Sequence, residues 1–406
     1  MTQVGWRFVA LYALAYTGAV LLFLAPALVS LALKVNALVG LERAPGSLAL
    51  IASVGALVAM VGNPLFGRLS DRTTSAHGRR RPWLIGGLVV GSVGILVVAV
   101  APSVSVVLLG WCVAQLSFNA VLAALVAVMP DRVPVAQRGQ VAGLLGVCMP
   151  VASVVGTFLV KLFAPNLVAM FLIPCAVGGF FILLFAMTMT DPRHDRTVQP
   201  RWSAREFAST FYVDVRRNPD FGWAFASRFL FVLAYAFLTT YQAYYLLDRL
   251  GTAEADVAQQ IFLGTLVQSI VIVAASLVGG RVSDRTGRRK VFVAAAAVVY
   301  GLALFLIAAA SDVNGFLVGM SISRLGFGLY MAVDLALVVD VLPDSGSTAK
   351  DLGVLNIAGA LPSSLAPALA PTILALGGGS YSVLYAVAGV CALLAAGAIL
   401  RVRGVH

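Results

Sequence analysis

A seven-residue segment occurs twice in this chain, almost unchanged. Residues 67–73 read GRLSDRT, and residues 280–286 read GRVSDRT, 213 positions later. Each copy ends a long apolar stretch and is followed by a basic cluster, at residues 78–81 and 287–290. An internal repeat at half the chain length indicates a duplicated architecture, in which each copy occupies the same place in its own half. The chain is therefore predicted to contain two equivalent halves.

The composition excludes a soluble protein. Of the 406 residues, 60% are hydrophobic and 11% are charged, and the mean hydropathy is +0.96, whereas soluble domains have about 25% charged residues. Most apolar stretches reach the roughly 20 residues that a helix needs to cross the hydrocarbon core, where spanning segments must satisfy their own backbone hydrogen bonds. We predict an all-α fold of twelve transmembrane helices in two six-helix bundles, at about 7–33, 47–67, 83–101, 104–128, 140–161, 167–190, 221–247, 257–280, 291–310, 314–341, 353–376 and 381–400.

The net charge of +11 comes mainly from basic residues in the loops between these stretches. With the N-terminus inside, 22 of the 28 Lys and Arg residues fall on the inner side and four on the outer side. Such an excess over short loops predicts orientation. We expect a multi-pass protein of the plasma or inner membrane with both termini cytoplasmic, its first stretch retained rather than cleaved. A lipid bilayer, not nucleic acid, is the expected partner.

One long polar stretch, residues 191–220, divides the chain. It separates an N-terminal six-helix bundle, residues 1–190, from a C-terminal one, residues 221–406. Its aromatic residues favour an amphipathic surface helix, and a plain cytoplasmic linker is an equal alternative. A second match supports the duplication, because Met129-Pro130-Asp131 and Leu342-Pro343-Asp344 are again 213 positions apart.

These segments resemble the major facilitator superfamily. The pattern Gly-x-x-Ser-Asp-Arg followed by Gly-Arg-Arg-Arg, between the second and third apolar stretches, is similar to its signature loop, and the second copy lies where that superfamily also has one. The longer first copy, residues 69–82, and the segments 340–343 and 352–357 are similar to the sucrose-transporter and glycoside–cation symporter branch. The resemblance implies an alternating-access transporter of a small molecule.

The resemblance also implies a role for the repeated hairpins. In that superfamily their acidic and basic residues form a cytoplasmic charge network that holds one conformation and breaks in the other. A carboxylate and an arginine at helix ends can form such a directional pair and bias a two-state equilibrium. For Arg79 and Arg80 the sequence favours a purely topological role. Carried over to this chain, the gate comprises Asp71, Arg72, Arg81, Asp284, Arg285 and Arg289.

Ionisable residues within the apolar stretches are costly, so each needs a reason. Arg228 lies in the seventh stretch, and Arg324 lies in the tenth, ten residues before Asp334. Asp334 is the only carboxylate well inside an apolar stretch, and we expect it to carry a coupling proton with Arg228 or Arg324 as its partner. A static ion pair is the alternative. Sodium coupling is less favoured because residues 47–67 contain no acid, and the fourth stretch also lacks the acid of sucrose-type proton sites.

Substrate contacts are expected from polar and aromatic side chains on the first, fourth, seventh, tenth and eleventh stretches. Tyr241 and Gln242 lie at the outer end of the seventh stretch and could close its mouth. Interfacial aromatic residues are the alternative for tyrosines and are preferred for Tyr244 and Tyr245, and interhelical hydrogen bonds are the alternative for the amides. The candidates are Tyr12, Tyr16, Gln115, Asn119, Tyr235, Tyr241, Gln242, Tyr330 and Asn356.

Two hypotheses for the function remain. The first is a proton-coupled symporter of a sugar or glycoside-like solute, and the second is a proton-antiport exporter of amphipathic or drug-like compounds. Pro150 follows Met149 rather than the glycine usual in such exporters, which argues mildly against the second. The sequence has no metal-ligand cluster, phosphate-binding loop or nucleophile constellation, so no enzyme activity, metal or cofactor is expected. A monomer is compatible with these features.

Overall fold

The computed structural model describes residues 4–191, 218–286, 288–340 and 348–403. Within these ranges every regular element is a helix, and twelve helical segments are long and apolar enough to cross a membrane. The prediction of an all-α, twelve-span fold is confirmed. Most of the predicted linker, residues 192–217, lies outside the described residues, as do the side chains of Asp71, Asp284 and Asn356.

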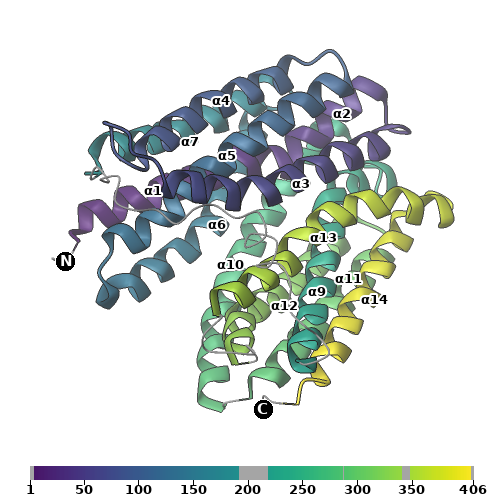
Figure 1. The fold of residues 1–406 in the computed structure, drawn as a ribbon. Helices are drawn as coiled ribbons and strands as arrows, with labels where there is room; N and C mark the ends of the chain where they lie inside the picture. Colours follow the sequence, from purple (N-terminus) through teal and green to yellow (C-terminus); the bar gives the residue numbers. More distant parts are fainter. Residues whose placement is uncertain (1–3, 192–217, 287, 341–347, 404–406) are drawn as a thin grey trace. The chain divides into compact units, whose positions relative to one another are not determined.

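The first compact unit comprises Met1–Pro200 and Ala253–Phe262. Its first span begins as one helix, passes through a wider π-helical turn that starts at Pro26, and continues as a short helix. Its elements, drawn from purple to blue-green in Figure 1, are α1 (Trp6–Ala25), η1 (Pro26–Ser30), α2 (Leu31–Val39), α3 (Ala44–Asp71), α4 (Arg81–Val100), α5 (Val104–Arg132), α6 (Val135–Phe163) and α7 (Leu167–Thr188).

The second compact unit comprises Arg201–Thr252 and Leu263–His406. Its first span also contains a π-helical turn, which here forms the end of the span. Its elements, drawn from teal to yellow in Figure 1, are α9 (Pro219–Tyr244), η2 (Tyr245–Arg249), α10 (Glu254–Thr286, which starts in the first unit), α11 (Arg289–Ala309), α12 (Val313–Asp340), α13 (Thr348–Leu376) and α14 (Tyr381–Leu400).

Corresponding helices pack in corresponding pairs within the two units. In the first unit, α1 packs against α6 and α7, α5 packs against α3 and α4, and α4 also contacts α7. In the second, α9 packs against α13 and α14, α11 packs against α12 and α14, and the Ser276 hydroxyl of α10 donates to the Gly328 carbonyl of α12 at 2.8 Å. The duplication predicted from the sequence is therefore visible in the internal packing of each unit.

Glycines allow close contacts between helices in both units. A Cβ placed on Gly18 of α1 would lie 2.6 Å from the carbonyl oxygen of Gly178 on α7. In the second unit, a Cβ on Gly301 of α11 would lie 3.1 Å from the carbonyl oxygen of Gly389 on α14. Small residues allow helices in lipid to approach and gain packing energy where the hydrophobic effect contributes little.

Candidate functional site

A charged cluster joins three helices of the first unit at the hairpin that the sequence repeat defines. Asp131, at the end of α5, accepts hydrogen bonds from Arg79 Nη2 at 2.5 Å and from Arg80 Nε at 2.9 Å. Arg80 is 3% exposed, and its Nη1 donates to the Ser70 hydroxyl of α3 at 2.8 Å. The sequence predicted only a topological role for these two arginines, whereas the structure gives both an ion pair.

The environment of Asp131 favours its charged form. Partial burial acts to raise the pKa of this carboxyl, but the hydrogen bonds from Arg80 and Arg79 and the charges of the two guanidinium groups outweigh burial and hold the pKa below its usual value. Charge-assisted hydrogen bonds of this kind are about twice as strong as neutral ones. Asp131 is therefore ionised at neutral pH and fixes the hairpin to α5.

A second set of contacts ties the same hairpin to the end of α7. Asp191 accepts hydrogen bonds from the backbone N–H groups of Arg80 and Arg81 at 2.7 and 2.8 Å. Gly78 has φ +99°, and a Cβ there would collide with the Asp191 side chain. The carboxylate therefore caps the N-terminus of α4, where the helix dipole favours a negative charge.

A basic residue in the first turn of the third span has the same kind of partner in both units. Arg81 Nη2 donates to the Met189 carbonyl at 2.6 Å, and Lys290 Nζ donates to the Val402 carbonyl at 2.6 Å. Both carbonyls follow the last helix of their unit. Among the other predicted gate residues, Arg72 and Arg285 are exposed and Arg289 is half-buried.

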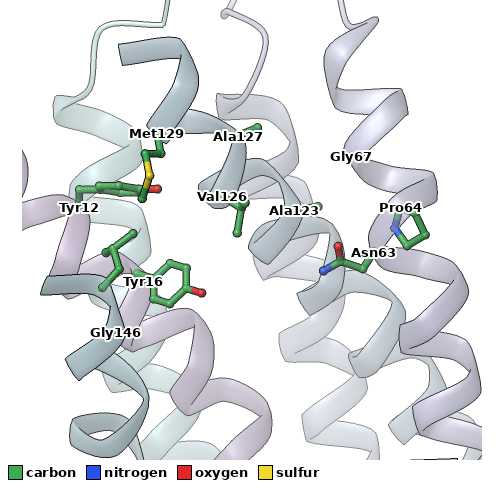
Figure 2. A pocket seen from close by; sticks show the side chains of 11 residues that line it. Tyr12, Tyr16, Asn63, Pro64, Gly67, Ala123, Val126, Ala127, Met129 and Gly146 are labelled. Carbon is green, nitrogen blue, oxygen red and sulfur yellow. The ribbon is translucent and has the colours of Figure 1, made fainter. Parts of the chain in front are cut away.

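A pocket of about 570 Å³ lies among the helices of the first unit. Figure 2 shows the Tyr16 hydroxyl of α1 and the Asn63 amide of α3 facing this space, with Met129 extending over the ring of Tyr12. The Tyr12 hydroxyl donates a hydrogen bond to the Leu125 carbonyl at 2.7 Å. The remaining lining is apolar or glycine: Pro64, Gly67, Ala123, Val126, Ala127, Leu145 and Gly146.

An amide pair supports the polar side of this pocket. Asn63 Nδ2 donates to Asn119 Oδ1 at 3.3 Å, and Asn119 Nδ2 donates to the Gln115 carbonyl at 2.8 Å. Asn119 is thus positioned from within its own helix and in turn positions Asn63. The sequence analysis selected Gln115 and Asn119 but missed Asn63, which is the residue of this set that lines the pocket.

The second unit contains an ion pair within its membrane-spanning helices. Arg228 Nη1 of α9 lies 3.0 Å from Asp334 Oδ2 of α12, and the two side chains are 19% and 8% exposed. Tyr330, one helical turn before Asp334, has a buried hydroxyl that interacts electrostatically with the carboxylate without reaching hydrogen-bond geometry. The Tyr330 ring stacks on Phe231 with centroids 3.7 Å apart. The structure thus pairs Asp334 with Arg228, one of the two arginines that the sequence left open.

The other arginine, Arg324, occupies a different environment. Its Nε donates to Gln268 Oε1 of α10 at 2.7 Å, and the guanidinium carbon lies 5.2 Å from the Tyr235 ring centroid and 5.8 Å from that of Phe327. Arg324 is 6% exposed. Cation–π contacts of this length are favourable, and they place the predicted candidate Tyr235 beside a buried positive charge.

Two other predicted contact residues are buried in helix packing. Tyr241 is 0% exposed and donates to the Pro367 carbonyl of α13 at 3.2 Å, and Gln242 is 4% exposed. The structure therefore does not place them at an opening. Tyr244 and Tyr245, for which interfacial positions were preferred, are both 0% exposed, and the Tyr245 hydroxyl donates to the Ile307 carbonyl. Their side chains therefore pack against neighbouring helices of their unit.

The residues that sequence reasoning missed had signals of different strength. Asp131 belongs to the second repeated segment, so its position at the hairpin could have been inferred. Asn63 is a single amide in an apolar stretch that contains no acid, so the sequence pattern gave only a weak signal for it. Gln268 is an amide in the eighth apolar stretch, and its contact with Arg324 depends on how α10 packs against α12.

These features together define a polytopic membrane transporter built from two like units. The family model described as "Major Facilitator Superfamily" matches residues 8–271 and 252–405, and the chain belongs to that superfamily. This match does not confirm the more specific resemblance to the sucrose-transporter branch.

Similar proteins support the fold and leave the substrate open. A stretch of 125 residues, 31% of this chain, is 34% identical to the Multidrug resistance protein MdtL of Klebsiella pneumoniae and spans 30% of that protein. The crystal structure of a variant of the nucleoside transporter NupG matches 97% of this chain and 99% of its own, with a TM-score of 0.78 and 13% identity. A bacterial homologue of the human lysosomal transporter Spinster, in an inward-facing and unoccupied conformation, matches 98% and 99%, with a TM-score of 0.70 and 14% identity.

Proposed function

We propose that this chain is a proton-coupled secondary transporter that moves a small amphipathic compound by alternating access. The Arg228–Asp334 ion pair carries this proposal. A carboxylate buried in a membrane-spanning unit is expensive and is retained where it has a function. Protonation of Asp334 would release Arg228, so a change in this contact links proton occupancy to the conformation of the unit.

The pocket of the first unit supports an amphipathic substrate. Its walls are formed mainly by Val, Ala, Leu, Met and Pro side chains, with Tyr16 and Asn63 as its polar groups and the Tyr12 hydroxyl already bonded to Leu125. Ligand pockets of this size and lining bind molecules with a large apolar body and a few oriented polar groups. The partial likeness to a protein named for multidrug resistance agrees with this chemistry.

A polar, glycoside-like solute is the second candidate, and the amide pair favours it. Asn63 is held by Asn119, and Tyr16 faces the same space, so one amide and one hydroxyl are available to a sugar ring. A sugar presents many hydroxyl groups, and each one left without a partner in an apolar pocket costs about 1–3 kcal/mol. This cost makes the amphipathic compound the better match.

The hairpin cluster supports the predicted gate in a modified form. We propose that Asp131 with Arg79 and Arg80 latches the hairpin of the first unit in one conformation and separates in the other. The proposal also keeps the orientation with both termini in the cytoplasm, in accord with the positive-inside rule. Labelling of single cysteines introduced at Ser75 and Arg403 tests that orientation, because both must react only from the cytoplasmic side.

Proteoliposome transport tests the proposed function. Radiolabelled 2-naphthoate and sucrose are compared with a proton gradient imposed in each direction in turn. We expect naphthoate to follow the gradient in one direction and sucrose to remain at equilibrium. Accumulation of sucrose instead would establish the second candidate.

Variants of two aspartates in the second unit test the coupling. Asp334→Asn should abolish gradient-driven accumulation and retain exchange of labelled for unlabelled solute, which also shows that the variant folds. Asp248→Asn, which removes an exposed carboxylate at the end of η2, should behave as the native protein. Unchanged accumulation by Asp334→Asn would remove Asp334 from the coupling mechanism.

A further inference from the structure

The guanidinium of Arg324 is a buried charge with little compensation. Among the described residues, its one hydrogen bond joins Nε to Gln268, and no carboxylate forms a salt bridge with it. An arginine presents five N–H donors in a fixed fork, so the two Nη groups keep their donor capacity. A cation buried among membrane helices without a counter-charge is costly.

The described membrane spans contain no other acid in a position to neutralise Arg324. Of the acidic residues within the membrane spans, Asp220, Asp248 and Asp256 lie within two residues of the ends of their spans. Asp334 lies ten residues further along α12, about 15 Å away at 1.5 Å per residue, and is already paired with Arg228. Among the described residues of the membrane spans, therefore, none supplies a negative charge to Arg324.

A second unsatisfied group lies in the same neighbourhood. Tyr300 of α11 is 0% exposed, and its hydroxyl has no hydrogen-bond partner among the described residues. It interacts electrostatically with Arg324 and with Tyr235. A buried hydroxyl without a partner costs free energy, and an oxyanion beside Arg324 would accept from it. Tyr235 is half-buried and stacks on Phe327 with centroids 4.6 Å apart, which gives the charge an aromatic wall.

The first unit shows that the fold does not require this charge. The repeats that flank the second and fourth spans of each unit are 213 residues apart, and the same spacing relates Gln268 to Gly55 and Arg324 to Trp111. A Cβ on Gly55 would collide with the Trp111 indole, which is 2% exposed. Glycine and tryptophan therefore fill in one unit the positions that glutamine and arginine occupy in the other. The polar pair is not explained by helix packing alone.

We propose that Arg324 binds the carboxylate of an amphipathic organic anion, with the aromatic rings of Tyr235 and Phe327 beside the apolar part. A guanidinium matches a carboxylate with two parallel hydrogen bonds, and aromatic neighbours suit a flat apolar body. This inference concerns the second unit only. That the bound anion is a transported substrate rests on the proposed function.

Binding to the purified protein in neutral-detergent micelles tests the inference without any proton gradient. The probes are 2-naphthoate and its neutral counterpart 2-naphthamide, and the readout is Kd from isothermal titration. Native protein should bind naphthoate about ten- to a hundredfold more tightly than naphthamide, the range that hydrogen bonds to a charged group supply. Equal affinities for the two probes would overturn the inference.

Two variants with opposite chemistry locate the site. Arg324→Gln removes the positive charge, and Gln268→Glu keeps it but places a carboxylate of the protein against Arg324. Both should lose the preference for naphthoate, and Gln268→Glu should keep or raise the thermal stability because it supplies the missing ion pair. A stable Gln268→Glu variant that retains the preference would contradict the assignment, even if Arg324→Gln fails to fold.

The same oxyanion chemistry is present in anionic lipid headgroups. Titration in nanodiscs with and without phosphatidylglycerol distinguishes the two sources. An unchanged Kd for naphthoate supports a soluble substrate, whereas its displacement by phosphatidylglycerol would reassign Arg324 to lipid. Charge-selective binding with no gradient-driven accumulation would defeat the transport proposal alone, and accumulation without charge selectivity would defeat this inference alone.

Discussion

The two units use the same contacts at the ends of their helices and different chemistry in the middle. At the ends, Arg81 and Lys290 bond to carbonyls that follow the last helix of their own unit. In the middle, Gly55 and Trp111 of the first unit correspond to Gln268 and Arg324 of the second. The helix-end contacts are thus shared by the two units, while the buried middle positions differ in chemistry, as the proposed anion site requires.

The Arg228–Asp334 pair extends this contrast. At the repeat spacing of 213 residues, the position of Asp334 corresponds to Val121 of the first unit, which is 0% exposed. An apolar residue thus suffices for packing at that position. The charged pair of the second unit is an addition to the scaffold rather than part of it, in accord with a role in coupling.

The largest expected effect tests this addition. Arg228→Leu leaves Asp334 buried without its counter-charge and should lower the free energy of unfolding by about 3–5 kcal/mol. The double variant Arg228→Leu/Asp334→Val should recover most of that loss, because replacing both partners by apolar residues is often neutral. Thermal unfolding in detergent, followed by tryptophan fluorescence, measures both. A double variant as unstable as the single one would show that the pair is required for folding.

The hairpin cluster provides the next effect. Asp131→Asn removes the charge that Arg79 and Arg80 share and should lower the free energy of unfolding by about 1.5–3 kcal/mol, the range for hydrogen bonds to charged groups. The variant also weakens the proposed latch, so cysteine accessibility at the hairpin should rise. Asp248→Asn is the control, since this carboxylate is exposed. Equal unfolding midpoints for the two variants would argue against the latch.

The same cluster should respond to pH. The pKa of Asp131 is lower in the folded protein than its usual value, so the unfolded chain binds this proton more tightly. The stabilisation is complete above the unfolded pKa of about 3.9 and is lost as the pH falls through the lower folded pKa. The native protein should therefore lose more stability than Asp131→Asn over this acidic range, and parallel pH profiles would contradict the cluster's contribution.

The sequence determined the span positions well and the side-chain partners less well. Hydropathy and charge are local signals, so the twelve helices and the two halves could be predicted. Burial of Tyr244 and Tyr245 could not, because it depends on the rotation of α9 and η2 about their axis. The partner of Asp334 was left between Arg228 and Arg324 for the same reason, since only the packing of α9 against α12 decides it.

A smaller effect tests the apolar counterpart of the Arg324 site. Gly55→Ala introduces a methyl group that collides with the Trp111 indole and should destabilise by about 1–3 kcal/mol through overpacking. Gly46→Ala, on the same helix, has open space at its Cβ and should be neutral. Adding Trp111→Leu to Gly55→Ala should restore part of the loss. A neutral Gly55→Ala would show that the two residues do not fill one space.

The smallest effects come from two helix-end contacts with different chemistry. Lys34 Nζ donates to the Ala99 carbonyl near the end of α4 at 2.9 Å, and the Tyr245 hydroxyl donates to the Ile307 carbonyl near the end of α11 at 2.5 Å. Each donor lies six residues before a glycine of positive φ, at Gly40 and Gly251, so the two positions correspond. The ammonium group of Lys34 in one unit and the phenol of Tyr245 in the other therefore make the same kind of hydrogen bond to a helix-end carbonyl.

Lys34→Met and Tyr245→Phe should each lower the free energy of unfolding by about 1 kcal/mol, the net value of one intramolecular hydrogen bond. The loss of stability in Lys34→Met should be no larger than in Tyr245→Phe, although the lysine is charged. Removing the ammonium also removes the free-energy cost of burying it. Since the two contacts belong to different units, the double variant should equal the sum within about 0.5 kcal/mol. A clearly non-additive result in denaturant unfolding would mean that the stabilities of the two units are coupled. The helix-end contacts could then not be treated as independent parts of each unit's scaffold.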